Sequence, residues 1–362
     1  MNYDKYLITL GQSGGLGSTT LKRLLKNFGC CKNIWQANAS DFTNIKASQG
    51  LIDKIEKIKK QNDPDEVLNL IIKNDLKVIT IFDECYPQLL KQIPNPPLIL
   101  YVRGNINCLN DEPKISIVGT RQQTYYGQNI LINFLNKWKD NLKATVSGLA
   151  YGIDSTVHQQ SIKNSIPTIA IVASGLDWLS FQPSGQKWLA KEIINHNGCL
   201  LSSFSINSPV SKHNFPQRNK LIAGLSKATI VVEAGKKSGA LITAQHALDY
   251  NREVYALPGD ITRDQSRGCN QLIADGANAL LDWQDIYKIF NINAINSNLE
   301  NKTFSRQQQL IINCLKLNNN LSIDELIEKV GTNQNQLISE LSNLEIDEVI
   351  KRDLFGNFYL TN

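Results

Sequence analysis

The sequence predicts an α/β fold in which helices cover a parallel, doubly wound sheet. From Ile115 to about residue 283, short apolar runs alternate with glycine turns and helical patterns. The apolar runs that we interpret as strands lie near residues 115–118, 144–147, 168–172, 199–203, 228–232 and 253–257. Buried strands that alternate with helices are typical of a parallel sheet with helices on both faces.

The chain is too long for one ordinary core, because 362 residues exceed the usual size of a single domain. Pattern and composition predict four segments along it. These are a helical domain at 1–75, the α/β core at 76–290, a linker at 291–303 and a small C-terminal domain at 304–362.

The N-terminal segment predicts two short helices, around 7–10 and 20–28, joined by a hairpin that contains Gly14, Gly15 and Gly17. This resembles a helix-hairpin-helix or SAM-like domain. The hairpin N–H groups could meet a nucleic-acid phosphate, but a hairpin that only packs a small domain explains the pattern as well. Further helical sequence at 40–74 precedes two expected strands, at 76–82 and 98–102.

The C-terminal segment predicts helices at 309–317 and 335–344, a capping box from Ser322 to Glu325, and a hairpin around 353–356. This order resembles a winged helix. Residues 304–362 hold five basic and eight acidic side chains, whereas a helix that enters a DNA groove needs a basic surface. We therefore expect a protein-contact or regulatory role here rather than binding of duplex DNA.

Positive charge is concentrated in the middle of the chain. Residues 114–303 hold 19 Lys and Arg against 13 Asp and Glu, out of a total net charge of +5. Between Lys187 and Lys237, eight basic residues face only two acidic ones. Such clustering suits a polyanionic partner, although a solvated basic face would give the same pattern if the stretch stood alone.

Several function classes are not expected. The seven cysteines are scattered without a C-x-x-C pair, and the four histidines form no H-E-x-x-H motif, so we expect reduced thiols and no metal. The N-terminus lacks the pattern of a secretory leader, and no apolar run approaches the roughly 18 residues of a membrane span. A cytoplasmic protein is therefore expected.

Glycine turns follow four of the predicted strands, at Gly119, Gly148, Gly175 and 235–239. In a doubly wound sheet, ligands bind beyond the carboxyl ends of the strands, where glycine lets backbone N–H groups approach a phosphate. Neither a G-x-G-x-x-G fingerprint nor a G-x-x-x-x-G-K-[ST] loop occurs, so we expect no dinucleotide or nucleoside triphosphate cofactor.

Basic, amide and aromatic side chains stand beside these turns. Arg121 follows the first strand, 214–220 opens a helix with the sequence NFPQRNK, and 267–270 reads RGCN. Arginine can bind phosphate with a planar fork, and Phe215 or Tyr151 could stack on a base. This combination favours a single-stranded nucleic acid.

Five blocks resemble the signature of the DNA-processing protein A (DprA/Smf) family. They are SIVGTR at 116–121, SGLAYGID at 147–154, NFPQRNKLIAGLS at 214–226, VEAGKKSGALITA at 232–244, and PG at 258–259 with SRGCNQLI at 266–273. The resemblance implies an extended Rossmann-like core that forms a homodimer and binds single-stranded DNA. It also implies that the protein protects incoming DNA and helps load the RecA recombinase during natural transformation, without catalysis.

Carried over block by block, the resemblance places the DNA contacts on basic, amide, aromatic and small residues of the turns. They are Gly119, Arg121, Gly148, Lys187, Asn214, Phe215, Arg218, Asn219, Lys220, Ser238, Gly239, Arg267, Gly268 and Asn270.

Two other readings remain at this point. Asp154 and Glu233, both at strand–helix junctions, could serve as an acid–base pair in a nucleotide-cleaving site. However, Asp154 could equally be the N-cap of a helix at 155–163, and the P-G-G-x-G-T loop that marks such enzymes is replaced by EAGKKSG at 233–239. Alternatively, the chain is mainly a protein-interaction scaffold, which need not exclude DNA binding.

Overall fold

The computed structural model of the chain describes residues 4–12, 15–179, 181–290, 304–318, 320–346, 349–353 and 356–360. The fold divides into two compact units, Met1–Trp283 and Gln284–Asn362. The predicted linker, 291–303, lies outside the described residues, as does Gly14 of the predicted hairpin.

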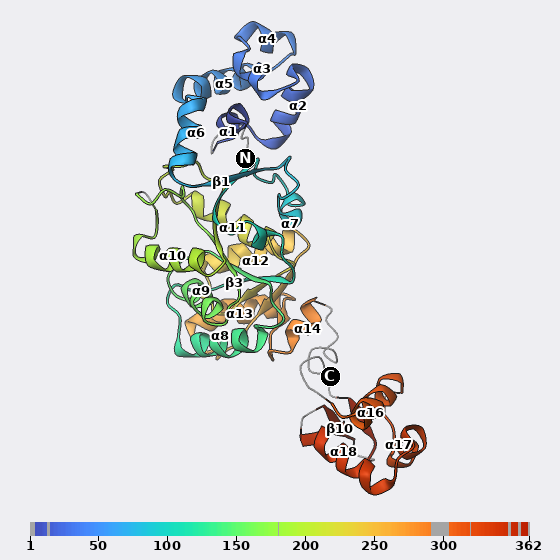
Figure 1. The fold of residues 1–362 in the computed structure, drawn as a ribbon. Coiled ribbons are helices and arrows are strands. Elements are labelled where there is room, and N and C mark those ends of the chain that lie inside the picture. The colour runs from blue at the N-terminus through green and yellow to red at the C-terminus, as the bar shows by residue number, and fades with distance from the viewer. Residues whose placement is uncertain are drawn as a thin grey trace. The chain divides into compact units, whose positions relative to one another are not determined.

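Within the described residues, nine strands of the first unit form one sheet in the order β1-β2-β6-β5-β4-β3-β7-β8-β9 (Figure 1). From β6 to β9 all neighbouring strands are parallel, whereas β1 and β2 extend the β6 edge antiparallel. The strands are β1 Lys77–Thr80, β2 Ile99–Gly104, β3 Lys114–Val118, β4 Ala144–Ser147, β5 Thr168–Ile171, β6 Cys199–Ser202, β7 Ala228–Val231, β8 Glu253–Ala256 and β9 Asn278–Ala279. The predicted α/β class and the six predicted core strands are confirmed.

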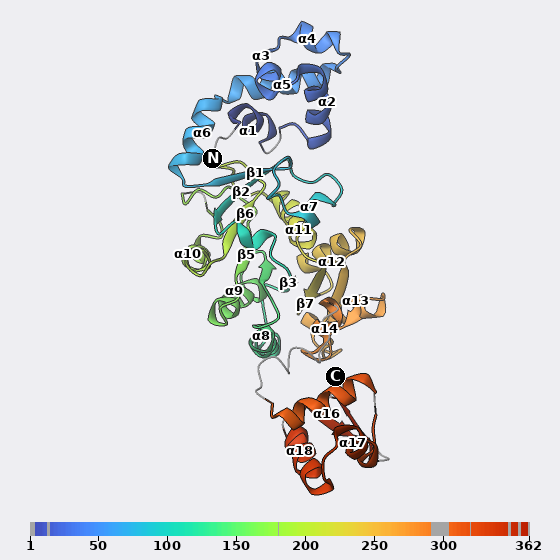
Figure 2. The same cartoon turned by 45° about the vertical axis from the view of Figure 1, so that its right-hand side comes forward.

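The central strands are apolar because both faces of the sheet are covered. Every residue of β3, β4, β5, β6 and β7 is buried. Figure 2 shows α8, α9 and α10 on one face and α11, α12 and α13 on the other. These helices are α8 Tyr125–Trp138, α9 Ile153–Lys163, α10 Lys187–Asn195, α11 Asn214–Gly224, α12 Gly239–Asp249 and α13 Asp264–Ala274, and η2 Ser184–Gln186 precedes α10.

The strand order reverses between β3 and β7. The chain proceeds from β3 outward through β4, β5 and β6, and then returns to place β7 on the other side of β3. Ser116 of β3 accordingly pairs with Val146 of β4 on one side and Thr229 of β7 on the other. The loops that follow these strands meet at this switch point, which is where doubly wound sheets bind ligands.

The N-terminal helices share a core with the sheet. They are α1 Lys5–Gly11, α2 Ser18–Phe28, α3 Cys31–Gln36, α4 Ala39–Asn44, α5 Gln49–Gln61 and α6 Pro64–Lys73. Their buried side chains belong to the same apolar cluster as those of β1 and β2. At Gly11 the approach is so close that an added Cβ would meet the side chains of Leu98 and Ile99.

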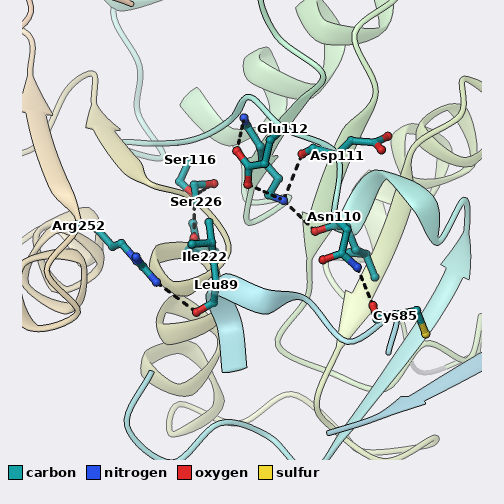
Figure 3. Close-up of polar contacts among 11 residues, drawn as sticks. Cys85, Leu89, Asn110, Asp111, Glu112, Ser116, Ile222, Ser226 and Arg252 are labelled. Carbon is teal, nitrogen blue, oxygen red and sulfur yellow. Dashed lines mark hydrogen bonds and ion pairs between the residues drawn. The ribbon is translucent and has the colours of Figure 1, made fainter. Parts of the chain in front are cut away.

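Polar contacts hold the segment between β1 and β3 on the core (Figure 3). This segment includes α7 Gln88–Lys91 and η1 Asn107–Leu109. The Arg252 guanidinium donates to the Leu89 carbonyl oxygen at 3.2 Å, and the Asn110 amide donates to the Cys85 carbonyl oxygen at 2.8 Å. At the start of β3, the buried Lys114 ammonium donates to the Leu109 carbonyl oxygen at 2.8 Å.

The second unit contains α14 Asp285–Phe290, α16 Arg306–Leu317, α17 Ile323–Val330, α18 Gln334–Ile346, β10 Ile350–Arg352 and β11 Phe358–Leu360. β10 and β11 pair antiparallel, as the predicted hairpin requires. The predicted capping box is present, because Ser322 accepts from the Glu325 N–H while the Glu325 carboxylate accepts from the Ser322 N–H. The helices and hairpin enclose an apolar cluster of their own.

None of the helices within the described ranges combines the length and apolar character that a membrane crossing requires.

Candidate nucleic-acid interface

Two adjoining cavities lie at the carboxyl ends of the strands. The larger, of about 580 Å³, is lined by loops that follow β4, β5 and β6. The smaller, of about 300 Å³, lies at the switch point between Gly119 after β3 and the start of α12. Both cavities are lined by Arg121, Ala150, Phe215 and Arg218, so these four residues form the shared wall.

The two arginines flank one aromatic ring. The guanidinium carbon of Arg121 lies 5.4 Å from the centroid of the Phe215 ring, and that of Arg218 lies 5.9 Å from it. At such distances the negative ring face attracts a cation. Arg121 is exposed to solvent, whereas Arg218 is only 6% exposed. The pair therefore presents one cation that solvent can reach and one that is enclosed by protein.

Arg218 spends its donors on the protein backbone. It donates to the carbonyl oxygens of Gly148, after β4, and of Ile171, at 3.0 Å and the end of β5. Its Nε donates to the Asn219 carboxamide oxygen at 3.0 Å. Burial lowers the pKa of Arg218, an effect that outweighs the attraction of Asp154. We conclude that Arg218 fixes the cavity wall.

Asp154 is enclosed beside Arg218. Its carboxylate accepts from the Ala150 N–H at 3.3 Å, and burial raises its pKa against the opposing attraction of Arg218. The alternative prediction that Asp154 is a helix N-cap is wrong, because Gly152 holds that position and α9 begins at Ile153. Gly152 has φ +79°, and an added Cβ would collide with the carbonyl oxygens of Thr120 and Arg121, so glycine is required there.

Glu233 is occupied at the start of α8. One carboxylate oxygen accepts from the Thr124 hydroxyl at 2.5 Å and the other from the Thr124 N–H at 2.9 Å. The side chain is 2% exposed, and neither cavity is lined by it. Glu233 thus stabilises a helix N-terminus, where negative charge is favourable.

The start of α12 forms the polar side of the smaller cavity. Ser238 is the N-cap, and its hydroxyl accepts from the Ala240 N–H at 3.3 Å. Gly239 follows, and an added Cβ there would meet no atom within 4 Å. The Asn219 amide reaches across to the Gly239 carbonyl oxygen at 3.2 Å. An 11-residue helix therefore begins beside open space.

The structure brings eight of the fourteen predicted residues to these cavities. They are Gly119, Arg121, Gly148, Phe215, Arg218, Asn219, Ser238 and Gly239. The remaining six line neither cavity; they are Lys187, Asn214, Lys220, Arg267, Gly268 and Asn270.

Several of those six support loops instead. The Asn214 amide donates to the carbonyl oxygens of Ala173 at 2.8 Å and Pro209 at 3.1 Å. Asn270 pairs with both backbone groups of Gly259, at 3.1 and 2.9 Å. The Gly268 N–H donates to the Ala234 carbonyl oxygen at 2.7 Å, and Arg267 is ion-paired with Asp264 at 3.3 Å.

Sequence reasoning missed part of the larger cavity. Gln182, Pro183, Pro209 and Val210 line it, and they come from the loops after β5 and β6. These loops lack the glycine and arginine pattern that identified the other turns. Their position beyond the carboxyl ends of two predicted strands was the one signal that could have found them.

Known proteins share both the sequence and the fold. Protein Smf of Synechocystis is 34% identical over 280 residues, which cover 76% of this chain and 70% of that protein. DNA processing protein DprA of Streptococcus pneumoniae is 36% identical over 211 residues, which cover 58% of this chain and 73% of that protein.

Two solved structures agree with these relatives. The X-ray structure of DprA from Streptococcus pneumoniae matches with a TM-score of 0.66 and 29% identity, over 81% of this chain and 100% of that one. A Helicobacter pylori structure, described as giving insights into the single-stranded DNA binding mode of DNA processing protein A, matches with a TM-score of 0.53 and 27% identity, over 59% of this chain and 94% of that one.

The resemblance seen in the five sequence blocks is confirmed by a family model. The model of DNA recombination-mediator protein A matches residues 77–291, which include β1 to β9 and the residues that line both cavities. The chain therefore belongs to the DNA recombination-mediator protein A family, whose relatives carry the names DprA and Smf.

Proposed function

We propose that this protein binds single-stranded DNA along the two cavities and does not cut it. The observation that carries the proposal is the exposed guanidinium of Arg121 against the Phe215 ring, on the wall that the cavities share at the switch point. The single-stranded DNA binding named for the Helicobacter pylori relative supports it.

The sugar-phosphate chain is expected to pass Arg121 and the start of α12. Arg121 offers charged donors, and a helix N-terminus attracts anions through its free N–H groups and its dipole. Gly239 leaves room beside that terminus. Phosphate contacts of this kind carry no base information, so little sequence preference is expected.

A cleaving site is not supported by the two carboxylates. Glu233 lines neither cavity and is bonded to Thr124. Asp154 lines the smaller cavity but is buried against Arg218. A general acid or base must reach the proton that it transfers, and Glu233 is not placed to share that work with Asp154.

As a finer proposal, the protein delivers the bound strand to the RecA recombinase during natural transformation, protects incoming DNA and acts as a homodimer. The description of the family as a recombination mediator supports the delivery role. The test is RecA filament formation on single-stranded DNA in the presence and absence of this protein. Equal rates in both would contradict it.

The binding proposal is tested by titration of the full chain with oligo-dT and with duplex DNA of equal length at several salt concentrations. We expect tighter binding of oligo-dT, with an affinity that falls as salt rises because bound phosphates release counterions. A parallel assay for nucleotide or phosphodiester hydrolysis should give no product. Equal or stronger binding of the duplex, or turnover, would contradict the proposal.

A further inference from the structure

We propose that the larger cavity is a nucleobase site, in which one unpaired base of the strand stacks on Tyr151 with Phe215 at the opposing wall. This inference rests on the proposed function and adds what the cavity recognises. It assigns the base to the larger cavity and leaves the phosphates to Arg121 and the smaller cavity.

The lining of the larger cavity suits an aromatic ring better than a phosphate. Apart from the two arginines and Gln182, its side chains are apolar or aromatic, and they include Ala173, Pro183 and Val210. A phosphate there would lose hydration without gaining donors, which is costly. Its volume of about 580 Å³ is within the range of about 300–1,000 Å³ found for small-molecule pockets.

The cations of the cavity do not change this reading. Arg218 is 6% exposed, and its printed hydrogen bonds run to two carbonyl oxygens and Asn219. Arg121 is exposed, but it lies on the wall shared with the smaller cavity. A phosphate held at that wall therefore leaves its attached base beside the apolar lining.

Tyr151 presents an aromatic surface that the fold does not use for packing. The residue is 52% exposed although it lines a cavity. Its position is set by its neighbours in the chain, since Leu149 has φ +56° and Gly152 φ +79° on either side. The phenol also extends over Gly185, where an added Cβ would collide with the hydroxyl. An exposed aromatic ring held in a fixed turn is suited to stacking.

The test compares oligo-dT with an abasic oligonucleotide that has the same number of phosphates. For the wild-type protein we expect at least about tenfold weaker binding of the abasic strand. Tyr151→Ala should weaken oligo-dT binding about tenfold, equivalent to about 1.4 kcal/mol, and leave abasic binding unchanged. Tyr151→Phe keeps the ring and is the matched control, with affinities within about twofold of the wild type.

Two further readouts separate stacking from charge. The salt dependence of Tyr151→Ala should have the wild-type slope, because no phosphate contact is lost. A 2-aminopurine base in the strand should be quenched by the wild type and by Tyr151→Phe but less by Tyr151→Ala. Normal thermal unfolding of both variants would show that the exposed side chain carries no structural role.

The outcomes distinguish this inference from the proposed function. If the abasic strand and oligo-dT bind equally well, or if Tyr151→Ala binds both like the wild type, the base site is refuted while single-strand binding stands. If the wild type binds neither strand, the proposed function itself fails. A loss that is the same for both strands in Tyr151→Ala would also overturn the base site.

Discussion

At the scale of single residues, the two arginines of the shared wall have different tasks. The sequence identified both from the blocks around 116–121 and 214–226. It could not distinguish an exposed guanidinium from a buried one, because burial depends on strands 50 and more residues away. The Arg218 bonds to Gly148 and Ile171 are of this long-range kind.

Arg121→Ala should weaken binding of oligo-dT at least about tenfold, or about 1.4 kcal/mol, and reduce the steepness of the salt dependence. The side chain is exposed, so the melting temperature should hardly change. Fluorescence anisotropy titrations and a thermal melt measure both effects. Arg267→Ala is the control, since Arg267 is also exposed but lines neither cavity, and it should bind like the wild type.

Arg218→Ala should reduce both binding and stability. We expect binding to fall at least about tenfold and the free energy of unfolding to fall by about 3 kcal/mol or more, because buried Asp154 and two carbonyl oxygens lose their partner. Urea unfolding beside the DNA titration measures the two losses. Wild-type stability in this variant would show that the buried guanidinium does not hold the strand ends together.

His158 should make stability depend on pH. It is fully buried on α9, its Nδ1 lies 2.7 Å from the Thr168 hydroxyl, and burial lowers its pKa to about 3. The unfolded chain therefore binds a proton below about pH 6.5 that the folded chain does not, and stability falls as pH falls from about 6.5 toward 3.

Between about pH 7 and about pH 5, this histidine should lower the free energy of unfolding by about 2 kcal/mol. Urea unfolding at both pH values measures the change. His158→Gln, which cannot be protonated, should lose correspondingly less stability over the same interval. Identical pH dependence of the two proteins would mean that His158 is not neutral at low pH in the fold.

At the scale of elements, hydrophobic pattern was sufficient where burial is complete. The predicted strand at 228–232 became β7, Ala228–Val231, because an apolar run of that length fits a sheet covered on both faces. The antiparallel pairing of β2 with β6 was not predictable, because nothing in the local sequence records which edge of a sheet a strand joins. The start of α9 was also misjudged, since the turn conformation at Gly152 decides it.

Gly152→Ala should disturb the turn that precedes α9. The added Cβ would occupy a backbone with φ +79° and collide with the carbonyl oxygens of Thr120 and Arg121. We expect a loss of about 1–3 kcal/mol in the free energy of unfolding, together with weaker binding as Arg121 is displaced.

Gly50→Ala is the matched control for that substitution. Gly50 lies in α5, and an added Cβ there would meet no atom within 4 Å. Alanine favours the helix, so stability should rise by up to about 1 kcal/mol and DNA binding should not change. Equal stability of Gly152→Ala and wild type would show that the turn can move without affecting the fold.

At the scale of the whole molecule, charge and core are divided between the units. The predicted basic region at 114–303 coincides largely with the sheet and its loops, whereas 304–362 hold five basic and eight acidic side chains. The apolar cluster of the C-terminal unit contains only residues from 304 onward, and the cluster shared by the sheet and N-terminal helices contains none of them. Removal of the tail should therefore leave the first core intact.

A chain that ends at residue 303 should accordingly bind oligo-dT with an affinity within about threefold of the full chain and with the same salt slope. The slope is informative because it reports how many phosphates are bound, independently of small changes in affinity. Contacts with protein partners, measured by the effect on RecA filament formation, should change instead. A tenfold loss of single-strand affinity on truncation would mean that the acidic tail takes part in DNA binding, and the assignment of the whole binding surface to the strand ends would then be wrong.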